Sequence, residues 1–214
     1  MLKKTDVNKV LEILEKEYGN TGTALKFQSP FQLLVSTMLA AQSTDKQVNK
    51  ITSELYRQYP EPKDFIRLSQ DELEEKIKSI GLYRNKAKNI LSMVRMLVSE
   101  YGSVVPQTRE ELVRLPGVGR KTANVVLSVG FRHDAIAVDT HVFRVSNRIG
   151  LASAKNVRET EEQLMKNIPQ KDWSSAHHWL IWHGRQICRA QNPRCEICPV
   201  QEFCEYYKSV LSEK

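Results

Sequence analysis

Apolar and polar residues recur along most of the chain with the three-to-four-residue period of amphipathic helices. No segment shows the strict alternation that is typical of half-buried strands. The chain is therefore predicted to be all-α. The period places the longer helices over residues 6–18, 30–42, 46–59, 70–81, 85–102, 140–149, 157–167 and 173–188.

Residues that begin and end helices support these ranges. Ser29 precedes Pro30, which combines an N-cap with proline at the first helical position. A capping box is predicted where serine or asparagine precedes glutamate by three positions, at Ser69 and Asn156. Aspartates stand at three further expected N-caps, and glycines or prolines follow several helices: Asp45, Asp139, Asp172; Gly19, Pro60, Pro62, Gly102. No repeat, low-complexity tract or long linker interrupts the series.

One segment predicts two short helices joined by a tight turn. Thr108 followed by Glu111 is a capping-box pattern, so the first helix is expected to run to about Leu115. The Pro-Gly-Val-Gly sequence at 116–119 cannot continue that helix, because proline restricts the preceding residue and glycine adopts left-handed conformations. A second helix is expected from about Arg120. The N–H groups and dipole at its start can bind an anion without a side-chain charge.

Lys121 falls in the first turn of this second helix, and Asp139 follows 18 residues later. An ordinary lysine has a pKa of about 10.4 and is protonated at neutral pH, so it cannot act as a nucleophile. Partial burial and the positive end of a helix both lower a lysine pKa, so the position of Lys121 suits a nucleophile. A lysine that binds phosphate or lies in solvent is the alternative interpretation. Asp139 has an alternative role as the N-cap of the following helix.

Charge and composition point to a polyanionic partner without identifying it. The net charge is +7 and the isoelectric point is about 9.2, and basic residues are in excess in both halves of the chain. No apolar run approaches the roughly 20 residues needed to cross a bilayer, and the N-terminus resembles an amphipathic helix, not a signal peptide. We therefore expect a cytoplasmic, nucleoid-associated protein. The absence of a heptad repeat predicts a monomer.

All four cysteines lie near the C-terminus with the spacing C-x6-C-x2-C-x5-C, at Cys188, Cys195, Cys198 and Cys204. Disulfides are not expected in a reducing compartment. A structural zinc site usually pairs two short C-x2-4-C knuckles, and only one such pair is present. Four thiolates with irregular spacing also suit a [4Fe–4S] cluster. The spacing alone leaves iron–sulfur and zinc nearly balanced.

The motifs LPGVGRKTA at 115–123 and VDTHVFR at 138–144, followed by the four cysteines, resemble the endonuclease III family of DNA base-excision glycosylases. The resemblance extends from about Ser29 to Cys204. It favours a [4Fe–4S] cluster held by the loop 188–204, in a structural role.

The resemblance also implies how the chain is organised. It implies one contiguous helical domain over 22–132, which contains a helix-hairpin-helix motif at about 108–130. A second, discontinuous domain comprises 1–21 plus 133–214 and includes the cluster loop. DNA is expected to enter the cleft between the domains, with Lys121 and Asp139 on opposite walls.

The resemblance assigns a reaction and its residues. Lys121 attacks C1′ of the damaged nucleotide and forms a Schiff base, and Asp139 stabilises cationic character at the sugar or helps to deprotonate the lysine. The target nucleotide must be flipped out of the duplex, and the resemblance implies that Gln42 and Leu82 fill the gap. The remaining DNA-contact residues are expected at the hairpin turn and beside Asp139: Gly117, Val118, Gly119, Arg120 and His141. His141 is expected to be structural or to contact phosphate.

Two other functions fit part of the pattern. A monofunctional mismatch glycosylase resembles this chain in the hairpin, the aspartate and the cysteines, but uses water and lacks a lysine at position 121. The adenine-specific relatives also carry glutamate where Thr37 stands here. A non-catalytic helix-hairpin-helix module with a zinc-stabilised tail would explain the charge, the hairpin and the cysteines, but not the pairing of Lys121 with Asp139.

Overall fold

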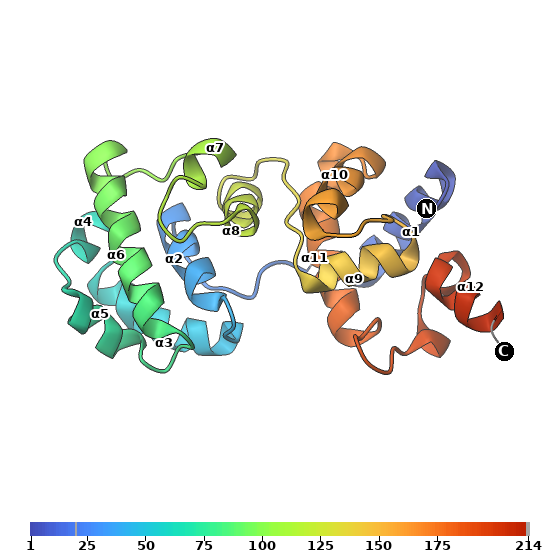
Figure 1. Ribbon diagram of the computed structural model, residues 1–214, viewed down its shortest axis with the longest axis horizontal. Helices are drawn as coiled ribbons and strands as arrows, with labels where there is room; N and C mark the ends of the chain where they lie inside the picture. Colours follow the sequence, from blue (N-terminus) through green and yellow to red (C-terminus); the bar gives the residue numbers. More distant parts are fainter. Residues whose placement is uncertain (20, 213–214) are drawn as a thin grey trace. The chain divides into compact units, whose positions relative to one another are not determined.

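The computed structural model describes residues 1–19 and 21–212, and every regular element within those ranges is a helix (Figure 1). This confirms the all-α prediction. The chain divides into two compact units: Ala24–His133 forms one, and Met1–Thr23 together with Asp134–Lys214 forms the other. Within the described ranges, no helix is long and apolar enough to span a membrane.

The contiguous unit is built around a buried central helix. Its helices are α2 (Pro30–Ala40), α3 (Asp45–Gln58), α4 (Pro62–Phe65), α5 (Gln70–Ile77), α6 (Tyr83–Glu100), α7 (Arg109–Leu112) and α8 (Arg120–Val125), with a π-helical turn η1 at Val126–Gly130. Helix α2 packs against α3, α6, α8 and η1. Residues 31–39 are all buried, because most of the helix surface is apolar and is enclosed by its neighbours. The polar exceptions, Gln32, Ser36 and Thr37, all make hydrogen bonds.

Two predicted caps in this unit are confirmed. The Ser29 hydroxyl accepts a hydrogen bond from the Gln32 N–H at 3.3 Å. The Ser69 hydroxyl accepts from the Glu72 N–H at 3.2 Å, and the Glu72 carboxylate accepts from the Ser69 N–H at 2.7 Å, which completes a capping box.

Other helix ends differ from the prediction. Thr44, not Asp45, caps α3, since its hydroxyl accepts from the Gln47 N–H at 3.2 Å. Asp45 becomes the first helical residue, where its charge still complements the helix dipole. Pro62 does not simply close α3; it begins α4, because proline is well suited to a first helical position.

Helix α7 ends at Leu112, three residues before the expected end at Leu115. The Arg114 and Leu115 N–H groups donate to carbonyls three residues earlier, so the chain tightens into a 3-10 turn before Pro116. The Thr108 hydroxyl accepts from the Glu111 N–H, but the Glu111 carboxylate accepts from the Thr108 hydroxyl instead of its N–H. Only half of the predicted capping box is therefore present.

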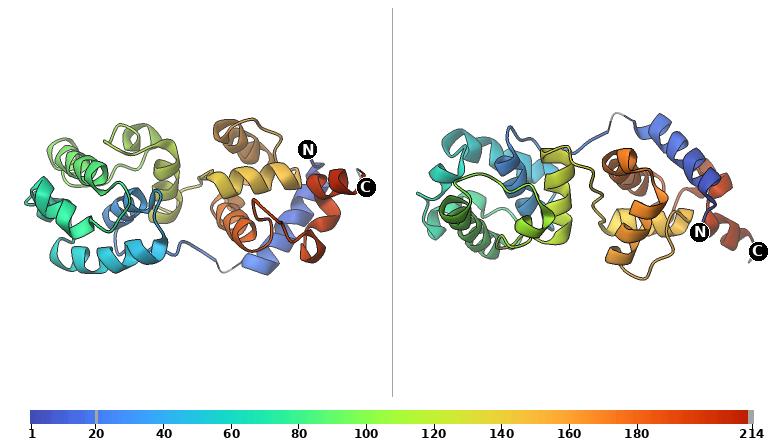
Figure 2. Two further views of the ribbon diagram at one scale, coloured as in Figure 1. Left: turned by 60° about the horizontal axis from the view of Figure 1, so that its bottom comes forward. Right: turned by 90° about the horizontal axis from the view of Figure 1, so that it is seen from above.

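The discontinuous unit joins the two ends of the chain. It contains α1 (Lys4–Tyr18), α9 (Thr140–Ile149), α10 (Val157–Asn167), α11 (Trp173–Gln186) and α12 (Glu205–Ser212), with 3-10 turns at Gln170–Asp172, Cys195–Ile197 and Gln201–Phe203. Helix α1 lies along α11, and both views in Figure 2 place α12 near the start of α1. Apolar side chains from α1, α9, α10 and α11 share one core. Segments more than 100 residues apart therefore fold as one body.

The predicted helices of this unit are present with small differences. Helix α1 begins two residues earlier than expected, and α12 was not predicted. Asn156 caps α10 through the Glu159 N–H at 2.9 Å, as expected, but the Glu159 carboxylate accepts from the Lys155 N–H and the Asn156 side chain, so the predicted capping box is incomplete. Asp172 precedes α11 but makes no side-chain cap, because it belongs to a 3-10 turn that runs directly into the helix.

Candidate functional site

The hairpin turn between α7 and α8 depends on one glycine. Gly117 has φ +77°, a left-handed conformation that side chains disfavour. A Cβ at this position would lie 2.8 Å from the Asn89 Cβ and 3.0 Å from the Met38 Cε. Val118, the next residue, is buried with 6% of its surface exposed. Only glycine therefore allows the turn to pack this closely against α2 and α6.

The start of α8 presents backbone N–H groups at the end of the hairpin turn. Gly119 is the N-cap and no side chain caps the helix. The N–H groups of a first helical turn have no carbonyl partner within their own helix, so they are suited to hold an anion. Arg120 and Lys121 are the first two residues of α8, and the Lys121 side chain is exposed. The partial burial considered for Lys121 from the sequence is not found within its unit.

Gln42 and Leu82, the two predicted gap-filling residues, share an unusual backbone conformation. Each has φ +58°, in the left-handed region that costs a side-chain-bearing residue about 1–3 kcal/mol. Gln42 follows the end of α2, and Leu82 directly precedes α6. Both side chains are exposed, and Leu82 retains 59% of its accessible surface. Strain of this kind persists where the surrounding structure imposes it, and it is concentrated at functional sites.

A buried lysine, which the sequence analysis did not single out, lies beside these two turns. Lys86 on α6 is only 7% exposed, and its Nζ donates to the carbonyl of Leu39 at 2.9 Å and to that of Ala41. Burial lowers the pKa of its ammonium group. The signal was available, because position 86 falls on the same helical stripe as the apolar residues 90, 93, 94 and 97.

Asp139 begins α9 in the other unit. Its Oδ1 accepts a hydrogen bond from the Val142 N–H at 2.8 Å, so the predicted N-cap is present. The residue is partly exposed, and its second carboxylate oxygen is not needed for this bond. Asp139 is therefore held in a fixed position by the same helix that it caps.

His141 lies two positions after Asp139, in the first turn of α9. Its Nδ1 accepts a hydrogen bond from the Arg144 guanidinium at 3.2 Å. Burial, with smaller contributions from Arg144 and Arg185, lowers the pKa of the imidazole despite the opposing charge of Asp139. The contact with Arg144 and the lowered pKa both favour the neutral imidazole, in which Nδ1 is the acceptor.

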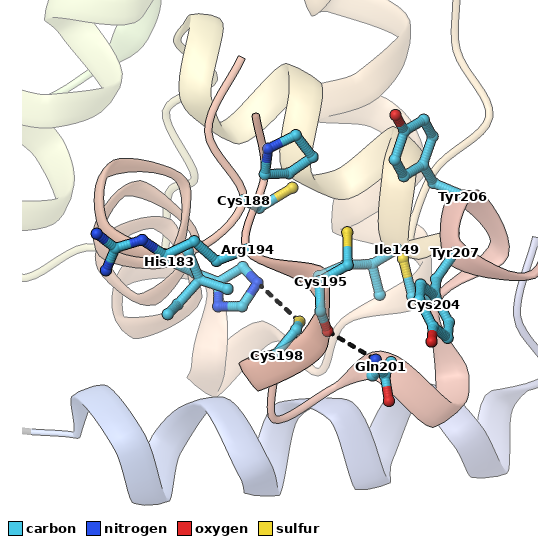
Figure 3. A pocket seen from close by; sticks show the side chains of 12 residues that line it. Ile149, His183, Cys188, Arg194, Cys195, Cys198, Gln201, Cys204, Tyr206 and Tyr207 are labelled. Atoms are coloured by element: carbon cyan, nitrogen blue, oxygen red, sulfur yellow. Dashed lines mark hydrogen bonds between the residues drawn. The ribbon is translucent and has the colours of Figure 1, made fainter. Parts of the chain in front are cut away.

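The four cysteines surround one small cavity between α11 and α12 (Figure 3). All four are free thiols, contributed by the loop after α11: Cys188, Cys195, Cys198 and Cys204. No three histidine, cysteine or acidic side chains within residues 1–19 and 21–212 meet closely enough to hold one metal ion. Four thiols set around a shared cavity are the ligands that a polynuclear iron–sulfur cluster requires.

Two arginines of α9, which the sequence analysis did not single out, hold this loop by hydrogen bonds. Arg144 donates to the carbonyl of Cys188 from Nε at 3.1 Å and from Nη2 at 3.0 Å. Arg148 donates to the carbonyls of Arg189 at 2.6 Å and Ala190 at 3.2 Å, and its Nη1 lies 3.7 Å from the Cys188 Sγ. The helix that Asp139 caps therefore also supports the cysteine loop.

The remaining contacts of the cysteines come from the core of the same unit. The His183 Nε2 lies 3.6 Å from the Cys198 Sγ, and its Nδ1 pairs with the Tyr18 hydroxyl at 3.2 Å. Burial lowers the pKa of His183 to about 4 and raises that of the Cys198 thiol to about 11. The thiol must lose its proton to act as a ligand, so metal binding is linked to proton release.

The predicted residues therefore fall into separate groups. The contiguous unit holds the hairpin turn, Lys121 and the turns at Gln42 and Leu82. The discontinuous unit holds Asp139, His141 and the cysteine loop.

Comparison with known proteins identifies the chain. Residues 35–170 match the family model of the HhH-GPD superfamily of base excision DNA repair proteins, and residues 188–204 match the iron–sulfur binding domain of endonuclease III. Endonuclease III of Rickettsia felis is 49% identical over 97% of this chain and 98% of its own, and that of Escherichia coli K12 is 46% identical over 94% and 97%. The chain belongs to the endonuclease III family.

Solved structures agree with this assignment. The structure of a trapped endonuclease III–DNA covalent intermediate covers 99% of this chain, with 47% identity and a TM-score of 0.92. A thermostable thymine-DNA glycosylase aligns with a TM-score of 0.86 at 24% identity, which shows a shared fold. The chain is a DNA glycosylase/AP lyase of base excision repair.

Membership of the family decides between the alternatives that the sequence left open. The four cysteines hold an iron–sulfur cluster and not zinc. A non-catalytic DNA-binding module is excluded, because the match spans the enzyme domain as well as the cysteine loop. Mismatch-specific relatives are expected to lack a lysine at position 121, and the adenine-specific ones to carry glutamate at position 37. This chain has Lys121 and Thr37 instead.

Proposed function

We propose that the protein removes oxidised or ring-saturated pyrimidines from duplex DNA through a Schiff base on Lys121, and then cleaves the strand 3′ to the site by β-elimination. The observation that carries this proposal is the position of Lys121, exposed on the first turn of α8 directly after the hairpin turn. Backbone amides that hold a phosphate at this turn would bring a nucleotide within reach of the amine.

Lys121 supplies the nucleophile in this scheme. Its neutral amine forms a bond to C1′ as the glycosidic bond breaks and the base departs with the bonding electrons and a proton. Opening of the sugar ring gives an iminium, which acidifies the C2′ hydrogen. Loss of that proton expels the 3′ phosphate and breaks the strand, and water then hydrolyses the imine to restore the lysine.

Asp139 supplies a negative charge in the same reaction. Because Oδ1 is bound to the Val142 N–H, the carboxylate is held in one orientation, and its other oxygen is not used in this bond. A carboxylate near C1′ stabilises positive charge as the base leaves, or accepts a proton from Lys121.

Contacts to DNA complete the proposal. The backbone of Gly117, Val118 and Gly119, with Arg120, would hold phosphates at the hairpin, and His141 would donate a hydrogen bond to another. Gln42 and Leu82 are already exposed on strained turns, as residues that enter a base stack must be. The cluster held by the four cysteines supplies structural stability to its loop, and no step of the reaction passes through it.

The cellular setting follows from the substrate. A monomeric enzyme that searches chromosomal DNA would be associated with the nucleoid in the cytoplasm. Its distribution can be measured by fractionation with and without nuclease treatment, and release by nuclease is the expected result.

Borohydride trapping tests the assignment of Lys121. Incubated with duplex that contains an oxidised pyrimidine, the protein should release the base and nick the strand. Borohydride added during turnover should reduce the iminium and leave a covalent protein–DNA adduct. Lys121→Gln keeps a polar side chain of similar reach but has no amine, so adduct and nick should disappear while DNA binding largely remains.

The same experiment separates the related activities. A glycosylase that uses water would release the base without efficient trapping. If Lys121→Gln forms the adduct at the wild-type rate, another amine is the nucleophile and the proposal is wrong.

A further inference from the structure

We propose that Lys86 is a positioning residue that couples the Gln42 turn to the Leu82 turn, so that both side chains enter the duplex as one unit. This inference rests on the proposed function, in which Gln42 and Leu82 fill the space of the flipped nucleotide. Lys86 itself is buried and does not reach the DNA.

Lys86 is bound to both turns. Its backbone N–H donates to the carbonyl of Leu82 at 3.1 Å, which closes the first turn of α6. Its side-chain ammonium donates to the carbonyls of Leu39 and Ala41 and lies 3.5 Å from the Ser43 hydroxyl. An ammonium group has three donors, and the three oxygens around it come from the residues on either side of Gln42.

The two turns also lie close to one another. A Cβ at Gly81 would lie 3.5 Å from the carbonyl oxygen of Gln42, and the Gln47 side chain donates to the Ser79 hydroxyl at 2.7 Å. Since Gln42 and Leu82 both have φ +58°, each turn is strained and would relax without external support. Lys86 supplies that support through its hydrogen bonds to both turns.

A role as a helix cap alone is the alternative interpretation of Lys86. Lysine side chains often satisfy the last carbonyls of a helix, and here the Leu39 and Ala41 carbonyls belong to the end of α2. If Lys86 only caps α2, it stabilises the fold. The effect of Lys86→Met on base release would then be the same whichever side chain stands at position 42. A positioning role requires that dependence, because Lys86 then acts through Gln42.

A double-mutant cycle distinguishes the two roles. Lys86→Met keeps the length of the side chain and removes its donors, and Gln42→Ala removes the gap-filling group. Base release is measured under single turnover in the complete protein with its cluster, on duplex containing a ring-saturated pyrimidine. The fluorescence of 2-aminopurine placed beside the lesion reports unstacking. Lys88→Met, on the same helix but exposed, controls for the lost charge.

We expect Lys86→Met to slow base release and reduce the fluorescence change by about tenfold in the wild-type background, and to have little further effect in Gln42→Ala. Lys88→Met should show no such coupling. Equal effects of Lys86→Met in both backgrounds would overturn the inference. If Gln42→Ala alone changes neither reading, the gap-filling role of Gln42 is wrong, which is a failure of the proposed function.

Hydrogen exchange provides a second test if Lys86→Met folds poorly. Lys86→Gln keeps two donors on a shorter side chain, and its folded fraction can be isolated by size-exclusion chromatography. Exchange at the amides of 41–44 and 81–83 should be faster than in the wild type, with α5 unchanged. Unchanged exchange in both turns would contradict the inference.

Discussion

At the scale of single residues, Asp139 combines a structural and a chemical role in one carboxylate. Its Oδ1 caps α9, and its charge is proposed to act on the sugar. The two roles respond differently to substitution, because asparagine retains an oxygen that accepts the cap hydrogen bond but has no charge.

Asp139→Asn should therefore keep nearly the wild-type melting temperature while base release falls by about 100-fold or more. Asp139→Ala should lose activity to the same extent and about 1 kcal/mol of folding stability as well. Single-turnover assays and thermal unfolding measure the two effects. On a pre-formed abasic site, where no glycosidic bond remains, Asp139→Asn should still give the borohydride adduct. If Asp139→Asn released the base at the wild-type rate, Asp139 would have only its structural role as the N-cap of α9.

Gly117 illustrates how one residue can determine a binding element. A side chain at this position would meet a left-handed backbone and the Asn89 Cβ at 2.8 Å. We expect Gly117→Ala to destabilise the contiguous unit by about 1–3 kcal/mol and to weaken DNA binding, since the hairpin amides would move. Denaturant unfolding measures the first effect.

Gly119→Ala is the matched control for stability. Gly119 has φ −90°, and a Cβ there would meet nothing within 4 Å. Its free energy of unfolding should change by about 0.5 kcal/mol or less. Equal destabilisation by the two substitutions would show that the packing of the turn against α6 is not what requires glycine.

At the scale of elements, the cysteine loop has little structure of its own. Between α11 and α12 it contains only two single 3-10 turns, and most of its hydrogen bonds with Arg144 and Arg148 are accepted by its backbone carbonyls. Such a loop depends on its ligands to stay ordered, because binding free energy and folding free energy are the same quantity at a structural metal site.

Cys198→Ser should accordingly lower the iron content, the visible absorbance and the melting temperature. Activity per folded molecule should change little, since the proposed reaction does not use the cluster. Iron analysis, absorbance and thermal unfolding measure these effects, with Glu196→Gln as a control in the same turn but without a ligand atom. A colourless Cys198→Ser protein with wild-type stability would contradict the structural role of the cluster.

Helix α9 connects the two functions of the discontinuous unit. Its first turn carries Asp139 and His141, and its later turns carry the arginines that hold the loop. Helix α9 therefore both fixes the proposed catalytic carboxylate and holds the cluster loop.

At the scale of the whole molecule, positive charge is distributed over the sequence and not confined to a tail. The net charge of +7 belongs to a chain in which one unit is a continuous segment and the other is folded from both ends of the sequence. Contacts between basic side chains or backbone amides and phosphates release counterions, so DNA affinity should fall as salt rises.

We expect the logarithm of the association constant to fall linearly with the logarithm of salt concentration, by at least about tenfold between roughly 50 and 200 mM. Fluorescence anisotropy with undamaged duplex measures the slope. Arg120→Ala should reduce the slope by about one, whereas Arg158→Ala, on α10, should leave it unchanged. A salt-independent affinity would contradict the proposed binding mode.

Local features of the sequence determined much of this protein. Helical period and capping residues act over a few positions, so the long helices, the Ser29, Ser69 and Asn156 caps and the start of α8 were predicted correctly. The hairpin motif and the cysteine spacing are equally local, and they sufficed to indicate the family. The positions proposed for catalysis were named from the same motifs and stay predictions.

Only the tertiary structure decided the features that depend on residues distant in the chain. The left-handed turns at Gln42 and Leu82 are imposed by packing between α2 and α6, and no local rule places such residues there. Lys86 is buried because its acceptors are carbonyls more than 40 positions away, which compensate the cost of burying an ammonium group. Period and capping extend only a few residues along the chain, whereas the support of these two turns arises where separate helices meet.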